Sequence, residues 1–427
     1  MKKTAASTTP ELDPSKSPKK VLTTRGVAVW LAAVIAMMLA VTGRTSMGVA
    51  GVYALDHFHI NAAQLAVFTS VQVGVYALTQ IPMGRIIDRY GAKRIILYGG
   101  LCMFLGQLIL ALTSSFSVAI IGRIFIGLGD STAFLSVMRL LPEWIPNKHA
   151  PLFSQLTGSI GQIGQFLSAV PFAALLAVSS WTTSFISLGA ISFIIVLGCV
   201  LIVRDSPTGT HRVYEGNITE QLRYVFSSPI SWQAFFLHWS GFALQATYTL
   251  LWAIPLMTLG MGISEATAHT LLVVNTVSTV AFSPLIGMIS IRLGYHRYRF
   301  NLLMGLLIIL SWMLFFLAGH HSMALLILVN IVTAGFGTVS GYGFDNIRER
   351  MRPEVIGTAT GLANMGGWIG AMIIGQVYGV LLNRHAELNW AAFADSAWFP
   401  GIMWLLSAVL ILLLQLRINA LAKKNAL

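Results

Sequence analysis

Three charged side chains lie inside long apolar stretches of this sequence. Arg44 lies in the first stretch, and Arg123 and Asp130 lie in the fourth. Gly127 comes between these two at helical spacing, so all three residues of the fourth stretch share one face of a helix. A charge near the centre of a bilayer costs at least about 2.5 to 3.5 kcal/mol. Each of these charges therefore requires a physical reason.

Anion binding coupled to proton transfer is the chemistry that these three residues could perform. Two guanidinium groups can hold a carboxylate through paired hydrogen bonds. Asp130 would compete for the arginines, and it could take up a proton when a substrate replaces it. The alternative interpretation is a static ion pair that stabilises the N-terminal half of the protein.

The second half of the chain offers neutral polar and aromatic candidates for substrate binding. Gln245, Tyr248 and Trp252 fall near the middle of the seventh apolar stretch. Asn330 and Asn364, in the tenth and eleventh stretches, could hydrogen-bond the hydroxyl groups of a sugar acid. Packing is the alternative role for the aromatic pair, and linking helices is the alternative for the asparagines.

The overall composition requires these stretches to lie in a membrane. Apolar residues make up 56% of the 427 residues, and charged residues only 10%. Such a composition excludes a disordered chain, and a soluble globule could not bury so much apolar surface. Two cysteines, both in apolar stretches, exclude a disulfide scaffold and a cysteine-based zinc site.

A helix needs about 20 mostly apolar residues to cross a bilayer. Twelve stretches of the sequence meet this requirement. They are residues 27–55, 63–83, 94–113, 117–141, 151–178, 181–203, 230–257, 265–290, 299–318, 322–346, 355–383 and 397–418.

Lysine and arginine residues lie almost entirely on one side of these predicted spans. Of the 27, 23 lie in the two terminal tails and the even-numbered loops, whereas Arg384 alone lies in an opposite loop. The positive-inside rule then predicts that both termini are cytoplasmic. This bias also accounts for most of the net charge of +12, so we expect no nucleic-acid partner.

These stretches divide the chain into two bundles with a connection and two tails. The predicted parts are a disordered cytoplasmic tail (1–26), an N-terminal six-helix bundle (27–203), a cytoplasmic linker (204–229), a C-terminal six-helix bundle (230–418) and a cytoplasmic tail (419–427).

An internal repeat relates the two bundles. The loops at 84–94 and 287–297 agree at five of eleven positions with a constant offset of 203. The same offset superimposes a threonine and two glycines of the fifth span on those of the eleventh. The sequence therefore predicts a duplicated six-helix unit.

The first of these loops, G-x-x-x-D-R-x-G-x-K-R, resembles the signature of the major facilitator superfamily. This resemblance implies an all-α membrane protein with twelve transmembrane helices in two pseudo-symmetric halves and a binding site between them. It also implies a cytoplasmic contact that holds the halves together in the outward-facing state. The gating residues expected there are Gly84, Asp88, Arg89, Gly91, Arg94, Arg139, Glu143 and Arg292.

The two copies of this loop differ at the position of the aspartate. In the first copy, the glycine turn could bring Asp88 to Arg139 and Glu143. In the second, Ile291 replaces the aspartate, so that half either makes a weaker contact or uses Asp345 and Glu349. The alternative is that these charges only set the topology.

A narrower resemblance covers residues of both halves. The pattern R-x3-G-x-G-D-S-x2-F that starts at Arg123 resembles the fourth helix of the anion:cation symporter family, whose members carry sugar acids and aromatic acids. Arg44 stands where that family places its first-helix arginine. The seventh and eleventh spans, Y-x3-W-x2-P-L and G-T-A-T-G-x2-N-x-G-G, are also similar. Gly43 and Asp130 depart from the pattern of this family. Some members have an acidic residue at the position of Gly43, and most have glutamate at the position of Asp130.

Taken together, these residues predict a secondary transporter that moves a small carboxylate with a proton, works as a monomer in a bacterial inner membrane, and uses no cofactor or metal. No phosphate loop, H-E-x-x-H motif or Cys/His cluster is present, so we expect neither an enzyme nor an ATP-driven pump.

The main alternative is a proton-driven antiporter that exports drugs or metabolites, although two arginines would repel cationic drugs. A sensor without transport is a third possibility. His238 is an alternative proton site, or a structural residue.

Overall fold

The computed structural model describes residues 21–208, 217–318 and 322–425. All regular elements within these ranges are helices. The first bundle contains α1 (Thr24–Val49), α2 (Gly51–Phe58), α3 (Ala62–Tyr90), α4 (Ala92–Leu112), α5 (Phe116–Trp144), α6 (Ala150–Leu167), η2 (Ser168–Phe172), α7 (Ala173–Val178) and α8 (Trp181–Ile202).

The second bundle follows a short linker helix, α9 (Ile218–Ser227). Its helices are α10 (Pro229–His238), η3 (Trp239–Ala243), α11 (Leu244–Thr247), η4 (Tyr248–Trp252), α12 (Ala253–Pro255), η5 (Leu256–Gly260), α13 (Glu265–Leu293), η6 (Gly294–His296), α14 (Arg297–Leu317), α15 (Met323–Gly337), η7 (Thr338–Gly341), α16 (Tyr342–Arg350), η8 (Pro353–Val355), α17 (Ile356–Leu382), α18 (Trp390–Ser396) and α19 (Trp398–Asn425).

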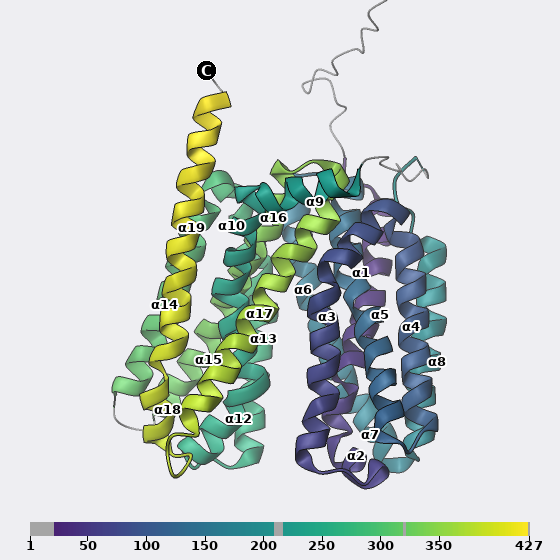
Figure 1. Cartoon of the computed structure of the whole chain (residues 1–427), viewed down its shortest axis with the longest axis vertical. Helices are drawn as coiled ribbons and strands as arrows, with labels where there is room; N and C mark the ends of the chain where they lie inside the picture. The colour runs from purple at the N-terminus through teal and green to yellow at the C-terminus, as the bar shows by residue number, and fades with distance from the viewer. Residues whose placement is uncertain (1–20, 209–216, 319–321, 426–427) are drawn as a thin grey trace, which may run out of the picture.

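The predicted twelve-span fold is confirmed. Ten described stretches are long and apolar enough to cross a membrane, and one of them, 266–317, contains both α13 and α14. The 29-residue helix α3 is the remaining span, and its end carries the charged loop. Figure 1 shows the two bundles side by side, with α9 crossing one end.

The ends of the chain differ from the predicted boundaries. Helix α1 starts at Thr24, inside the predicted tail, and α19 continues to Asn425 instead of ending near residue 418. The predicted tail residues 1–20 and linker residues 209–216 lie outside the described residues.

Two helix pairs make the most extensive contacts between the bundles. Helix α3 packs along α17, and α6 packs along α13. An Asn61–Gln64 capping box fixes the start of α3, with Gln64 N donating to Asn61 Oδ1 over 2.9 Å. Near its other end, Gly84 lies so close to the carbonyl oxygen of Gly357 that a Cβ atom would clash with it. The absence of a side chain at residue 84 therefore permits this close approach.

Substitution of Gly84 by valine should weaken the contact between the bundles. The added side chain would overpack α3 against α17, which typically costs about 1–3 kcal/mol. Thermal unfolding of the purified protein measures the effect as a lower midpoint. Gly74→Val on the same helix is the matched control, because a Cβ there would meet nothing within 4 Å. Equal midpoints for the two variants would contradict the prediction.

Candidate functional site

An ion pair between the first and fourth spans lies in the N-terminal bundle. Arg44 Nη1 of α1 is 3.2 Å from Asp130 Oδ2 of α5. The Asp130 side chain is 3% exposed and that of Arg44 is 19% exposed, so the arginine retains access to a larger partner. The predicted juxtaposition of these two charges is therefore present.

Aromatic rings from both halves surround the Arg44 guanidinium. Its Cζ lies 5.5 Å from the ring centroid of Tyr76 on α3 and 5.6 Å from that of Trp368 on α17. The two rings contact each other at 5.3 Å in an edge-to-face arrangement. Cation–π attraction stabilises a desolvated guanidinium in such a setting. Arg44 is thus held where the two bundles meet.

Asn364 connects the bundles beside this pair. Its amide nitrogen donates to Tyr76 Oη over 3.0 Å and to Gln80 Oε1 over 2.8 Å. Asn364 belongs to α17 and both acceptors belong to α3, so these hydrogen bonds cross between the halves. Of the C-terminal candidates, Asn364 is the one that these contacts bring to the Arg44 region.

Arg123 is almost fully buried, and its hydrogen bonds go to backbone carbonyl groups. Its Nε donates to the Phe68 carbonyl over 3.3 Å, and its Nη2 donates to the Arg44 carbonyl over 3.4 Å. Among the described residues, its Nη1 has no hydrogen-bond partner, and neither does the side-chain amide of Gln72. Buried polar atoms normally find partners, so these two groups need a further explanation.

The other C-terminal candidates bond within their own bundle. Gln245 Nε2 donates to Thr279 Oγ1 over 3.1 Å, and Tyr248 Oη donates to Asn330 Oδ1 over 3.3 Å. The Trp252 ring packs edge-to-face on Tyr378. Tyr248 and Trp252 line a separate groove that does not include Arg44. His238 is buried, with its ring stacked on Phe242.

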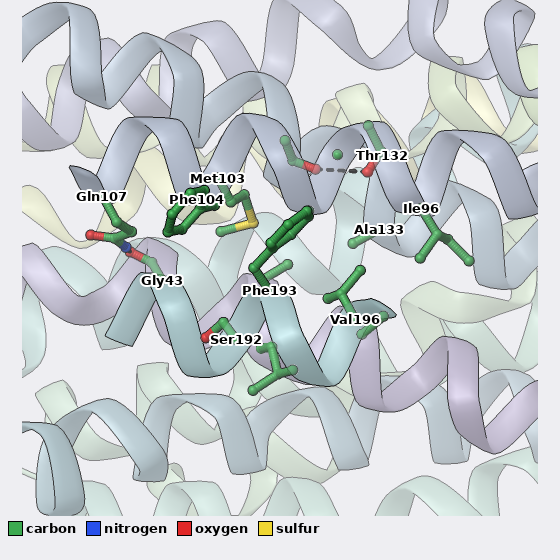
Figure 2. A pocket seen from close by; sticks show the side chains of 17 residues that line it. Gly43, Ile96, Met103, Phe104, Gln107, Thr132, Ala133, Ser192, Phe193 and Val196 are labelled. Atoms are coloured by element: carbon green, nitrogen blue, oxygen red, sulfur yellow. Dashed lines mark hydrogen bonds between the residues drawn. The ribbon is translucent and has the colours of Figure 1, made fainter. Parts of the chain in front are cut away.

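A small cavity of about 30 Å³ lies inside the N-terminal bundle (Figure 2). It holds about one water molecule, so it is too small for an organic anion. Gly43 lines it, and a Cβ there would meet Met103 and the Gln107 amide. A side chain at position 43 would therefore project into the bundle, toward the cavity and not toward the rings around Arg44.

Asp88 forms the contact between the bundles at the end nearest α9. Its carboxylate accepts hydrogen bonds from the backbone N–H groups of Gly357 and Thr358 and from the Thr358 hydroxyl, all within 2.9 Å. It thereby caps the N-terminus of α17, where a negative charge is favourable. Arg139 Nε lies 3.4 Å from Asp88 Oδ1, and Arg139 also pairs with Glu143 at 3.1 Å.

The other gating candidates have simpler surroundings. Gly91 has φ +88°, which glycine adopts without strain, and a Cβ there would meet the Asp205 carboxyl. Arg89 and Arg94 are exposed, and the Arg89 guanidinium lies over the Tyr90 ring. Arg292 is also exposed.

Arg297, the last residue of the second copy of the loop, takes part in a buried ion-pair network. It makes two hydrogen bonds of 2.6 and 2.7 Å to Glu349. Asp345 accepts from Ser290 over 2.6 Å and pairs with Arg348 at 2.8 Å. All of these partners belong to the C-terminal bundle, so these hydrogen bonds and ion pairs lie within one half.

Comparison with known proteins identifies the family. The model of the Major Facilitator Superfamily matches residues 33–375. The chain belongs to this superfamily. Its members in the comparison include an uncharacterized transporter, YybO, of Bacillus subtilis, which is 22% identical over 79% of this chain and 84% of that protein. The predicted superfamily is thus confirmed.

Other relatives of the superfamily match a shorter part of the chain. The probable sulfoacetate transporter SauU of Cupriavidus necator is 24% identical over 43% of this chain and 42% of its own length. The probable L-galactonate transporter of Escherichia coli is 24% identical over 44% of this chain and 40% of its own length. The chain thus spans about two fifths of the length of these two relatives.

Solved structures of the superfamily share the fold. The proton:xylose symporter XylE, bound to 6-bromo-6-deoxy-D-glucose, superimposes with a TM-score of 0.72 at 14% identity, covering 91% of this chain and 95% of XylE. FucP in the outward conformation gives a TM-score of 0.72 at 13% identity, covering 91% of this chain and 99% of FucP.

Sequence reasoning missed Tyr76 and Trp368, whose rings lie against Arg44, and it missed Gln72 and Gln80 on the same helix as Tyr76. Gln72, Tyr76 and Gln80 recur every four residues, and Trp368 follows Asn364 by four. Such spacing puts each set on one helix face, which is the signal that could have found them.

Substitution of Asp88 by asparagine should destabilise the contact between the bundles. Asparagine keeps the size of the side chain but loses the charge that caps α17 and pairs with Arg139. Hydrogen bonds to charged groups contribute roughly 1.5–3 kcal/mol each, so we expect a loss in that range. The midpoint of thermal unfolding measures it, with the exposed Asp395→Asn as the control. The prediction fails if both variants unfold like the parent protein.

Proposed function

We propose that this superfamily member is a secondary transporter that moves a small organic anion, such as a sugar acid or aromatic acid, together with a proton. One observation carries the proposal: the Arg44–Asp130 ion pair lies against Trp368 of the opposite half. A group at the junction of two bundles can contact a substrate from either side of the membrane.

The charges of this cluster favour an anion. Arg44 and Arg123 contribute two positive charges and Asp130 one negative charge, so the cluster is net positive when Asp130 is ionised. A buried uncompensated charge is costly, and an anionic ligand would reduce this cost. The unpartnered Nη1 of Arg123 and the amide of Gln72 are further groups that a carboxylate or a hydroxyl could satisfy.

Proton coupling follows from competition for one guanidinium. A substrate carboxylate that binds Arg44 displaces Asp130, which has no second hydrogen-bonded cation among the described residues. Protonation then removes the uncompensated negative charge on Asp130. Substrate and proton would therefore enter together, and the ion pair would form again after both have left.

Hydroxyl recognition falls to the neutral residues between the bundles. Asn364, Tyr76 and Gln80 already exchange hydrogen bonds across the interface. A sugar acid could replace some of these bonds with its own hydroxyl groups. The names of several relatives, which include sugar-acid and sulfoacetate transporters, support this substrate class.

The Asp88 contact would close the side of the protein that bears the termini. The positive-inside rule favours the cytoplasm for that side, so the arrangement would face outward. The protein would work as a monomer in the inner membrane of a bacterium, since each chain contains both halves of the proposed site.

Replacement of Arg44 by alanine should abolish uptake of the anionic substrate and strongly weaken its binding. Galactonate, glucuronate, glucarate, sulfoacetate and an aromatic acid would first be screened by thermal shift, because a ligand at 100 times its Kd adds about 2.7 kcal/mol of stability. Losing charge-assisted bonds worth about 1.5–3 kcal/mol each should weaken binding by roughly 100-fold.

The control for this variant is Arg417→Ala, which removes an exposed arginine of α19. Normal uptake by the Arg44 variant would overturn the anion site, and stabilisation by lipophilic cations alone would favour drug export.

Replacement of Asp130 by asparagine should separate exchange from accumulation. The variant keeps a polar side chain beside Arg44 but cannot carry a proton. We expect proteoliposomes to retain counterflow of labelled substrate while a pH gradient no longer drives accumulation. Retained accumulation would assign the coupling proton to another residue, with His238 the next candidate.

A further inference from the structure

A large groove lies on the C-terminal bundle, separate from the site around Arg44. It has a volume of about 530 Å³, and its walls come from α14 and α19. The seventh span, Pro229–Gly260, and α17 line it with Tyr248, Trp252 and Tyr378. In Figure 1, α14 and α19 lie on the side of this bundle that faces away from the N-terminal half.

The edge of this groove faces the hydrocarbon of the bilayer. Leu317, Trp398 and Leu405 line it, and each exposes more than half of its surface. Exposed apolar side chains on the perimeter of a membrane bundle contact lipid, not water. A lipid chain can therefore enter the groove sideways from the bilayer.

The polar tips of several lining residues already have partners inside the protein. Tyr378 Oη donates to the Phe393 carbonyl, Tyr248 Oη to Asn330, and Trp312 Nε1 to Thr333. None of the lining residues carries a charge. These three rings thus turn apolar surface to the groove, whereas Nε1 of Trp252 and of Trp404 has no hydrogen-bond partner among the described residues. A lining without charge still favours a hydrocarbon ligand over a sugar acid.

The length of the groove matches one leaflet. Its lining residues on the seventh span run from Leu244 to Leu256, which is about 18 Å at the rise of a helix. Half of a hydrocarbon core of about 30 Å is about 15 Å. The seventh span begins next to α9, and these residues lie toward its opposite end. The groove is therefore in the leaflet on the side of the membrane opposite the linker.

We propose that this groove binds one acyl chain of a membrane phospholipid from that leaflet. The bound chain contacts Trp252 of the seventh span and Tyr378 of α17, whose rings pack against each other with centroids 5.7 Å apart. It thereby stabilises the packing between these two spans. This site is independent of the anion site and does not rest on the proposed function.

Gly401 allows a direct test because it lines the groove and a Cβ there would meet nothing within 4 Å. Gly401→Trp should place an indole in the groove, and its Cβ atom would meet no neighbour within 4 Å. The matched control is Gly198→Trp on α8, an exposed glycine of the other bundle where a Cβ also meets nothing. Ala397→Phe, at a second lining position, serves if the Gly401 variant does not fold.

The full-length protein would be placed in phosphatidylethanolamine nanodiscs that contain a phosphatidylethanolamine probe with a diazirine on one acyl chain. After photolysis, mass spectrometry maps the labelled residues. We expect the strongest labelling on groove residues of α14 and α19. Gly401→Trp should lower this labelling at least about fivefold, which corresponds to roughly 1 kcal/mol in binding, whereas Gly198→Trp should leave it unchanged.

Labelling spread evenly over the lipid-facing helices would overturn the proposal, as would groove labelling that Gly401→Trp leaves unchanged. Cross-links from the groove to a second copy of the chain would overturn it as well, because the groove would then be an interface between protomers.

Discussion

A positive charge buried at the junction of two helical bundles is the constraint on which the rest of this structure depends. Arg44 cannot lose its charge, so its surroundings must compensate for the water that it gives up. Asp130 supplies a counterion, and Tyr76 and Trp368 supply ring faces. Because Trp368 comes from the opposite bundle, the energy of this one guanidinium depends on how the two halves are packed.

One face of α3 connects that guanidinium to the contact near the linker. Gln72, Tyr76, Gln80, Gly84 and Asp88 follow one another at intervals of four residues. Their partners on α17 run in the opposite direction: Asn364 meets Tyr76 and Gln80, and Thr358 meets Asp88. Under the proposed mechanism, separation of α3 from α17 would break hydrogen bonds along this face, and this would link substrate binding to the gate.

The fold and the central ion pair could be predicted because both follow from the cost of placing charge and backbone in lipid. Twelve apolar stretches, a 203-residue repeat and a charge inside an apolar span are each visible in a single sequence.

The directions of side chains were harder to predict. The seventh span contains the π-helical segments η3, η4 and η5, which rotate its faces, and Tyr248 and Trp252 line a lateral groove. Neutral residues such as Tyr76 cost little in a span, so only their spacing of four residues marked them.

The single aspartate of the cluster also limits the charge that moves under the proposed mechanism. With Asp130 ionised, the empty cluster of two arginines and one aspartate has a net charge of one. Binding a monoanion and one proton restores that same net charge, so the loaded and empty forms differ little in electrostatic cost as they rearrange. A side chain at position 43 would project toward Met103 and Gln107. Under the proposed mechanism, this charge balance favours electroneutral transport of a monoanion with one proton, in which the membrane potential would supply no driving force and the pH gradient would supply all of it.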